Sequence, residues 1–415
     1  MLTTGIVMNS DSIKQFETNV RKELNDNIVA FWTNRTIDEK GGFIGRMTGD
    51  GIIETKAPKG LILNTRILWT FSALYVFDKK PQYLELAKRQ YDYLMEHFWD
   101  KDFGGMFWLV DYMGNPLDRK KQIYGQGFAI YSLSEYYRAS GDKEPLDKAK
   151  EVFDLLEKHA WDKKYGGYFE SCDRDWKMSK VQQLTSGDMA VAKSMNTSLH
   201  AVEGIANLYD VDKDKLVGKR VGDMLDIFTD RILHPYGTYC QLFFSEMWYP
   251  KSETVSFGHD IETSWLLYKD AQILNDTKIL EKIRRMSLKL AEAVYENGLD
   301  NKTSMLYEST PEGISNSEKH WWVQAEAVIG FLNAYQLTGK KEYFDVAQNI
   351  WKFIEDNLVD KKNGEWFWKV DAKGRVDKSS YKVSEWKGPY HNGRACIEII
   401  NRLKQIQQSC SQFPL

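Results

Sequence analysis

The stretch HFWDKDFGGMFWLVDYMGN (97–115) decides the fold, because the chain repeats its pattern. Close copies read FWTNRTIDEKGGFIGRMTGDG (31–51), HAWDKKYGGYFESCDRDW (159–176) and NLVDKKNGEWFWKVDAKG (357–374). Weaker copies read LHPYGTYCQLFFSEMWYP (233–250) and LDNKTSMLYESTPEG (299–313). The six copies are marked, at steps of 63, 62, 70, 67 and 60 residues, by Gly42, Gly105, Gly167, Gly237, Ser304 and Gly364. Self-similarity at a regular spacing is the signature of a repeat architecture, so six units of similar length fill the chain.

Each unit follows one order of elements. It begins with an amphipathic helical run such as PQYLELAKRQYDYLMEHF (81–98) or KEYFDVAQNIWKFIEDNL (341–358). An Asp/Lys/Gly turn and a short aromatic hairpin such as MFWLV (106–110) come next. A second, more apolar helix then closes the unit. These second helices are expected at 63–77, 126–139, 196–209, 261–274, 322–337 and 393–406.

The two helix types predict two concentric layers. Amphipathic helices suit an outer ring, and helices that are apolar on all sides suit an inner ring buried on both faces. Twelve helices in six pairs therefore predict an all-α (α/α)6 toroidal barrel. An open solenoid is the alternative, but it would need polar capping repeats at both ends, and the sequence shows none. Without a Pro/Gly/Ser-rich linker, residues 1–415 are expected to form a single catalytic domain.

The repeat also predicts where a site lies. Because the hairpin leads into the second helix in every unit, all inner helices should begin at the same end of the barrel. His97, His159 and His234 fall at the ends of outer helices, where free carbonyls and the helix dipole favour a histidine, so we expect structural roles for them. His320 fits a packing or turn role as well as a site role.

Three more histidines stand at the junctions that lead into inner helices. They are His200 in unit three, His259 in unit four and His391 in unit six. In a ring of six, units three and four are neighbours and unit six lies opposite unit three, so His391 should face the other two. Imidazoles on opposite sides of a cavity suit proton removal from one face and delivery to the other at neutral pH.

Helical spacing adds polar and aromatic neighbours to these histidines. Asn196 lies four residues before His200, and Glu262 lies three residues after His259 and is expected to support it. Further candidates from other units are Arg66, Tyr124, Trp322, Glu326 and Trp386. For the tryptophans core packing is an equal possibility, and Glu326 could be a buried structural acid.

The amino-acid composition limits the classes of partner that the protein is expected to bind. The formal charge of -3 favours neither nucleic acid nor an anionic membrane, and no apolar run is long enough to span a bilayer. The four widely spaced cysteines (Cys172, Cys240, Cys396 and Cys410) are expected to be free thiols in a reducing cytoplasm. The 14 Trp, 22 Tyr and 20 Phe residues are mostly core, but flat aromatic faces also bind sugars.

Five stretches resemble one enzyme family over essentially the whole chain. RILWTF (66–71), SMNTSLH (194–200), SFGHDIE (256–262), HWWVQAEA (320–327) and WKGPYHNGR (386–394) are similar to the cellobiose 2-epimerases of the N-acylglucosamine 2-epimerase superfamily. The resemblance implies an (α/α)6 barrel that epimerises C2 of the reducing-end glucose of cellobiose or related β-1,4-disaccharides. It implies no cofactor and no metal. Together with composition it leads us to expect a cytoplasmic monomer with a disaccharide as its partner.

The same resemblance implies residue roles. His259 and His391 look like the pair that exchanges the C2 proton through a cis-enediolate, and His200 looks like an assistant in ring opening. Arg66 would stabilise the enediolate charge. Substrate contact or support of the histidines is implied for Tyr124, Asp188, Asn196, Glu262 and Glu326, and sugar stacking for Trp322 and Trp386. The role of Asp188 is the one that the resemblance supports least, because SGDMAVAK (186–193) matches the family only loosely.

Other functions stay open at this point. An (α/α)6 glycoside hydrolase could draw a carboxylate pair from Glu262, Glu326 and Asp260. A sugar-binding protein would need only the aromatics, and a metal-dependent isomerase could use His259 and Glu262 as ligands. Within the superfamily, N-acylglucosamine 2-epimerase and mannose isomerase activities are alternatives. Epimerisation of cellobiose is the prediction.

Overall fold

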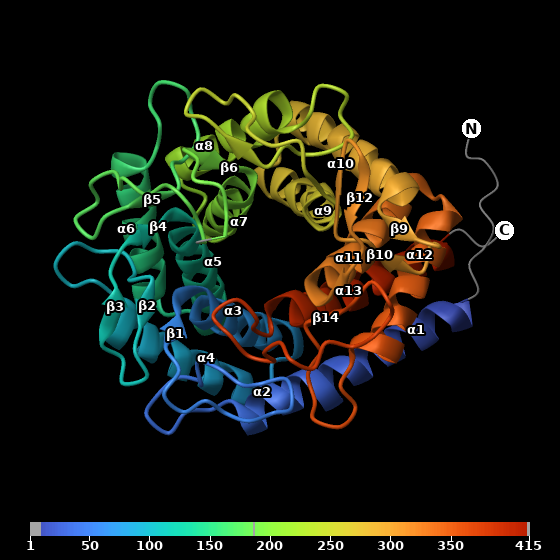
Figure 1. Ribbon diagram of the computed structural model, residues 1–415, viewed down its shortest axis with the longest axis horizontal. Coiled ribbons are helices and arrows are strands. Elements are labelled where there is room, and N and C mark those ends of the chain that lie inside the picture. The colour runs from blue at the N-terminus through green and yellow to red at the C-terminus, as the bar shows by residue number, and fades with distance from the viewer. Residues whose placement is uncertain (1–9, 186, 413–415) are drawn as a thin grey trace.

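Two concentric rings of helices form the molecule, as Figure 1 shows for the computed structural model, which describes residues 10–185 and 187–412. Within these residues the inner ring consists of α3 (Leu61–Asp78), α5 (Ile123–Ser140), α7 (Met195–Asp212), α9 (Phe257–Leu274), α11 (Trp321–Thr338) and α13 (Tyr390–Gln412). Each inner helix packs on the next, and α13 packs on α3, which closes the ring. The predicted (α/α)6 barrel is confirmed.

The outer ring covers the inner helices. Its members in the described residues are α1 (Ser10–Lys22) with α2 (Ala30–Arg35), α4 (Pro81–Tyr93), α6 (Lys143–His159), α8 (Lys215–Ile227), α10 (Thr277–Asn297) and α12 (Lys341–Phe353). Four of these outer runs contain wide π-helical turns that the sequence pattern did not predict: η1 (Glu23–Val29), η2 (Leu94–Phe98), η3 (Phe228–Ile232) and η4 (Ile354–Leu358).

Burial explains which helix goes where. Every residue from Leu61 to Leu74 of α3 is buried, and so is every residue from Trp321 to Ala334 of α11. In α4 the buried positions, among them Tyr83, Leu86 and Gln90, recur at three- and four-residue spacing. A helix without a polar face has no stable place at the surface, whereas a helix with one apolar stripe does. The apolar pattern therefore sorts inner from outer helices.

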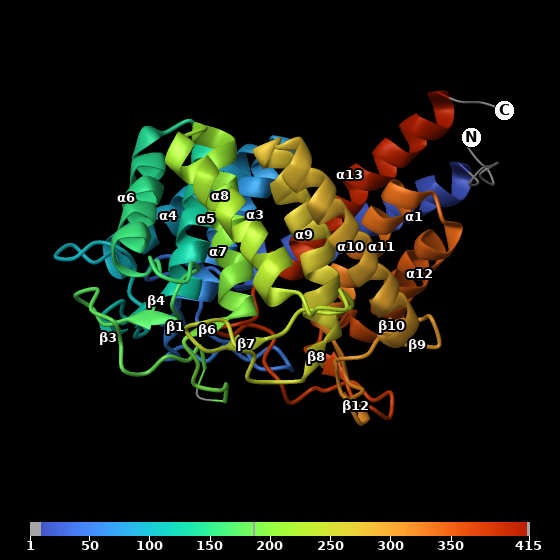
Figure 2. The same ribbon diagram turned by 90° about the horizontal axis from the view of Figure 1, so that it is seen from above.

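Short strands lie at the end of the barrel where the inner helices begin, which Figure 2 shows from the side. Those that precede inner helices are β1 (Lys59–Gly60), β4 (Lys121–Gln122), β6 (Lys193–Ser194), β8 (Val255–Ser256) and β13 (Lys319–His320). Those in the hairpins are β2 (Leu109–Val110), β3 (Pro116–Asp118), β5 (Ser171–Cys172), β7 (Phe243–Phe244), β9 (Leu299–Asp300), β10 (Ser304–Met305), β11 (Glu308–Thr310), β12 (Gly313–Asn316) and β14 (Lys369–Val370).

Most of this pairing joins neighbouring units, which the hairpin prediction did not foresee. The strand before an inner helix is antiparallel to a strand of the next unit, as in β1 with β2 and β4 with β5. The Met47–Val383 bridge links the first unit to the sixth. Within units, the expected hairpins are often single bridges such as Trp99 to Met106. The ladders therefore fix each inner-helix start relative to its neighbour.

In most units, a buried lysine that precedes the inner helix forms an ion pair with an aspartate of the turn after the outer helix. Two residues before α5, Lys121 Nζ lies 3.0 Å from Asp100, which belongs to the turn after the outer helix of the same unit. Lys59–Asp38, Lys193–Asp162, Lys319–Asp300 and Lys382–Asp360 repeat the pair in other units. In unit four, His234 and Val255 occupy the corresponding positions, so that unit has no such pair among the described residues.

Three of the cysteines are buried in the scaffold, and the outer-ring histidines pack against aromatic rings. Cys172, Cys240 and Cys396 are buried free thiols, while the side chain of Cys410 lies outside the described part of the chain. In the described residues, the structure contains no helix that is long and apolar enough to cross a membrane. His97, His159 and His234 lie at or just after outer-helix ends. His97 packs against Tyr93, and His159 and His234 stack on Trp176 and Tyr239 respectively.

Replacing the junction lysine of unit three should destabilise the barrel. Lys193 is fully buried, and its Nζ lies 2.6 Å from Asp162 while donating to the carbonyls of Gly166 and Glu246. Lys193→Met leaves the carboxylate unpaired, so the free energy of unfolding should fall by roughly 3–5 kcal/mol. Denaturant unfolding measures this, with Lys352→Met in the exposed Lys352–Asp356 pair as the matched control. Equal, small losses in both variants would show that the buried pair is not structural.

Candidate active site

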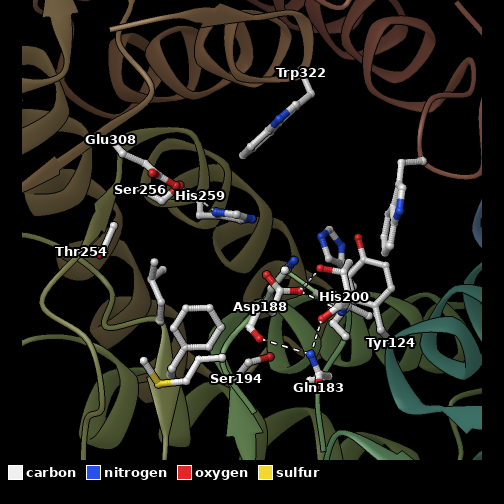
Figure 3. A pocket seen from close by; sticks show the side chains of 18 of the residues that line it. Tyr124, Gln183, Asp188, Ser194, His200, Thr254, Ser256, His259, Glu308 and Trp322 are labelled. Atoms are coloured by element: carbon white, nitrogen blue, oxygen red, sulfur yellow. Dashed lines mark hydrogen bonds between the residues drawn. The ribbon is translucent and has the colours of Figure 1, made fainter. Parts of the chain in front are cut away.

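A cavity of about 610 Å³ opens at the barrel end where the inner helices begin. Of the eleven site residues proposed from the sequence, ten line it: Arg66, Tyr124, Asp188, Asn196, His200, His259, Glu262, Trp322, Trp386 and His391. Figure 3 shows several of the side chains, with Ser256, His259 and Glu308 on one wall and Tyr124 and His200 on another. The volume is typical of a small-molecule site.

Glu326 is the exception, because it lies one layer behind the cavity wall. It is fully buried, and its Oε1 lies 2.7 Å from His391 Nδ1. Its other oxygen accepts a hydrogen bond of 3.0 Å from the Trp265 indole. The geometry therefore gives Glu326 the position of a support for His391 rather than of a direct ligand contact.

Arg394 forms the centre of a buried charge network beneath the cavity. Its guanidinium donates to Glu262 Oε1 at 2.9 Å and to Glu326 Oε1 at 2.7 Å, and it also bonds to Glu203. Tyr390 donates its hydroxyl to Glu203 at 2.6 Å. Sequence reasoning missed both Arg394 and Glu203. Their signal was the spacing of three residues from His391 and from His200, which places each pair on one helix face.

The network and its burial shift the pKa values of the three glutamates in different directions. Burial alone would raise the pKa of Glu203, but Arg394 and the hydrogen bonds from His200 and Tyr390 lower it to about 2. Burial and the neighbouring Glu326 raise the pKa of Glu262 well above its usual value, and burial raises that of Glu326. Because these two carboxyls share one guanidinium nitrogen and repel each other, the pair holds a proton more readily than exposed glutamates do.

Each of the three junction histidines has a defined partner on Nδ1. His200 Nδ1 lies 2.8 Å from Glu203, and His391 Nδ1 lies 2.7 Å from Glu326. His259 Nδ1 lies 2.8 Å from the hydroxyl of Ser256. The predicted support of His259 by Glu262 is therefore wrong in geometry, because Glu262 is hydrogen-bonded to Arg394 instead.

The imidazoles of His200 and His391 are buried, that of His259 is half-buried at the cavity wall, and all three are held neutral. Burial, and next the unfavourable interaction of two protonated rings that His200 would cause, lower the pKa of His259 to about 3. Burial and the nearby Arg66 and Arg394 place the pKa of His391 well below its usual value. Burial also lowers the pKa of His200, against the opposing effect of Glu203. At neutral pH each ring is therefore able to accept a proton.

Aromatic rings and one arginine complete the walls. Trp322 lies against both proposed proton-transfer residues, with ring centroids 4.8 Å from His259 and 5.7 Å from His391. Arg66 donates to the Trp386 carbonyl at 2.8 Å and to the Tyr124 hydroxyl at 3.0 Å. Burial raises the pKa of Tyr124 to about 12, so this phenol keeps its proton. Arg66 is the cation among the residues that line the cavity.

The remaining lining positions provide polar atoms. The Oδ1 atom of Asn196 is buried without a partner among the described residues, so it can accept from a ligand. Asp188 lines the cavity but accepts from the backbone and hydroxyl of Thr185 within its own loop. Sequence reasoning missed Glu170, Tyr307, Glu308 and Trp368, which reach the cavity from the hairpins. Glu170, Tyr307 and Trp368 occupy one repeat position, at which the carbonyl accepts from the first amide of the preceding inner helix, so the repeat register was the signal that could have found them.

Two other polar candidates prove to be structural. His320 ends β13, where it stacks on Tyr307 with ring centroids 4.0 Å apart and bonds to Glu318. Asp260 is buried and accepts from the Cys240 amide at 2.8 Å, and burial raises its pKa to about 8. Gln126 makes the same contact with the Met106 amide in unit two. Asp260 therefore holds a hairpin and does not face the cavity.

A metal site has one possible location in the described residues. Glu262, Glu326 and His391 offer ligand atoms within 4.8 Å of one another. Arg394 already donates to both carboxylates, and the His391 nitrogen bonds to Glu326, so a guanidinium occupies the cationic position of this cluster. His259, which the sequence analysis considered as a metal ligand together with Glu262, is not one of these three residues.

Comparison with known proteins places this geometry in a family. A family model described as N-acylglucosamine 2-epimerase (GlcNAc 2-epimerase) matches residues 42–393. The chain belongs to this family. It is 42% identical to a cellobiose 2-epimerase from Bacteroides fragilis, over 92% of this chain and 97% of that one. The structure of a cellobiose 2-epimerase from Spirochaeta thermophila is 37% identical, with a TM-score of 0.88 over 95% of this chain and 98% of the other.

More distant relatives have other named activities. A D-mannose isomerase from Marinomonas mediterranea is 24% identical over 90% of this chain and 95% of its own length. An N-acylglucosamine 2-epimerase from Bos taurus is 22% identical over 95% of this chain and 93% of its own. The chain is thus considerably more similar to the cellobiose 2-epimerases.

The protonation state of His259 can be tested directly. Because burial lowers its pKa to about 3, the ring should remain neutral at pH 5, where a free histidine with a pKa of about 6.5 is mostly protonated. Long-range proton–nitrogen NMR spectra of the wild type should show a neutral His259 ring, assigned by its absence in His259→Asn. A titration midpoint near 6.5 would contradict the assigned environment.

Proposed function

We propose that this protein reversibly epimerises C2 of the reducing-end glucose of cellobiose and related β-1,4-disaccharides, giving the mannose epimer. The observation that carries the proposal is the set of three neutral imidazoles around one cavity that also contains Arg66. Identity of 42% to a cellobiose 2-epimerase, against 24% to a mannose isomerase, supports the disaccharide substrate.

The reaction requires a proton to leave C2 and return on the other face. Ring opening exposes the aldehyde, which acidifies the C2 proton, and His200 is positioned by Glu203 to assist this step. Either His259 or His391 then takes the proton, and the other protonates the opposite face of the cis-enediolate. Trp322 contacts both rings, so a sugar stacked on it would have one histidine on each side.

The charge that develops on the enediolate needs a cation. Arg66 has its guanidinium fixed by Trp386 and Tyr124 and lines the cavity, so it can donate to the enediolate oxygens without reorganising. Asn196, Asp188 and Glu262 are proposed to contact sugar hydroxyls, and Trp322 and Trp386 to stack on the two sugar units. Glu326 is proposed to support His391.

The alternatives have weaker support. A hydrolase needs two carboxylates that face each other across the scissile bond. Here Glu262 and Glu326 both bond to Arg394, and Asp260 bonds to the Cys240 amide. Binding alone would not require three neutral imidazoles around the cavity. Arg394 lies at the one candidate metal cluster of the described residues and supports chemistry that is independent of a metal.

We also propose that residues 1–415 act as one monomeric catalytic domain, with the disaccharide as partner and with no nucleic-acid or membrane partner. The buried free thiols Cys172, Cys240 and Cys396 support a cytoplasmic location, where thiols stay reduced.

Isotope incorporation tests the proposed reaction. Cellobiose incubated with the protein in deuterated water should give glucosyl-mannose that carries deuterium at C2, because the proton passes through histidines that exchange with solvent. NMR and mass spectrometry identify the product, and chelator should not change the rate. His259→Ala and His391→Ala should each lose net epimerisation. Release of free glucose would show a hydrolase, and epimer without C2 deuterium would exclude the enediolate.

A further inference from the structure

We propose that Ser256 is a positioning residue that allows neutral His259 to carry its ring proton on either nitrogen. The proposal rests on the function above and adds a residue to it. Ser256 lines the cavity, is buried, and bonds to His259 Nδ1 at 2.8 Å. It does not itself touch the reacting atoms.

The Nδ1 partner of His259 differs in kind from those of the other two histidines. Glu203, whose pKa is lowered to about 2, faces His200, and Glu326 faces His391. The Glu326 oxygen that faces His391 also accepts from Arg394, so each carboxyl acts as an acceptor toward its histidine. Each carboxyl therefore fixes the proton on Nδ1 and leaves Nε2 of the neutral ring as an acceptor. A serine hydroxyl can accept or donate. His259 can thus present Nε2 either as an acceptor or, when Ser256 donates to Nδ1, as a donor.

A comparison within the chain shows that the Ser256 hydroxyl is diverted from an ordinary role. Ser194 and Ser256 both directly precede an inner helix, α7 and α9. The Ser194 side chain caps α7 by accepting from the Thr197 amide. The Ser256 side chain makes no capping bond to α9. A missing cap costs helix stability, so the bond to His259 replaces a contact that the serine would otherwise make.

The backbone of Ser256 is held so that its hydroxyl stays in place. In the β8–β11 ladder Ser256 pairs with Glu308, and directly paired residues lie on one face of a sheet. Both side chains line the cavity beside His259, as Figure 3 shows. Because unit four lacks the buried lysine pair of its neighbours, this ladder is a main constraint on the start of α9.

The ratio of C2 exchange to epimerisation tests the inference. In deuterated water, Ser256→Ala should slow epimerisation about tenfold or more, since a buried hydrogen bond to a working group is lost. His391 deprotonates one of the two epimers, and that step does not depend on Ser256. For that epimer, exchange of the C2 proton with solvent should persist, so the ratio of exchange to epimerisation should rise about tenfold. Ser256→Thr keeps the hydroxyl and should restore the wild-type ratio.

Control variants separate this effect from damage to the fold. Asp214→Ala removes a side-chain cap from the outer helix α8 and should lower thermal stability while leaving the ratio unchanged. Ser256→Gly, tolerated at a helix start, provides a second variant without the hydroxyl if Ser256→Ala folds poorly. An unchanged ratio in both Ser256 variants, or equal loss of exchange and epimerisation for both epimers, would overturn the inference. Absence of C2 deuterium in wild-type product would instead overturn the proposed function.

Discussion

The buried guanidinium of Arg394 is the interaction on which the site depends. It comes from α13 and reaches Glu203 on α7, Glu262 on α9 and Glu326 on α11, so one side chain joins four of the six inner helices. Two of these acids carry the histidines, since Glu203 bonds to His200 and Glu326 to His391. A buried charge cluster of this kind is stable only when every member is paired, which makes the relative positions of the helices specific.

The six-fold repeat explains how such a cluster arises without a special fold. Each unit delivers the first turn of an inner helix to the same end of the barrel, and the strand ladders align these turns with one another. Different residues at equivalent places then produce an asymmetric site. Ser194 caps its helix while Ser256 bonds to a histidine, and Gln126 and Asp260 hold equivalent hairpins. Unit four departs most from the pattern and contributes His259.

The sequence could predict what depends on periodicity. The six marker residues predicted six units, and their register separated His97, His159 and His234 from the three histidines that line the cavity. Contacts across the barrel were not predictable in this way. Glu262 was assigned to His259 because the two are three residues apart, but spacing along one helix cannot reveal a stronger cation on another helix, and Arg394 binds that carboxylate. Cross-unit ladders and π-helical turns likewise arise from packing between units.

Substitution of Arg394 by lysine tests the dependence on this one guanidinium most directly. A lysine keeps the positive charge, but an ammonium is a point donor that cannot reproduce the planar fork between three carboxylates. With the fold verified by circular dichroism, kcat/KM for cellobiose epimerisation by Arg394→Lys should fall roughly 100-fold, because misplacing the imidazoles by about 1 Å costs that much. A kcat/KM equal to that of the wild type would show that the histidines are positioned independently of Arg394.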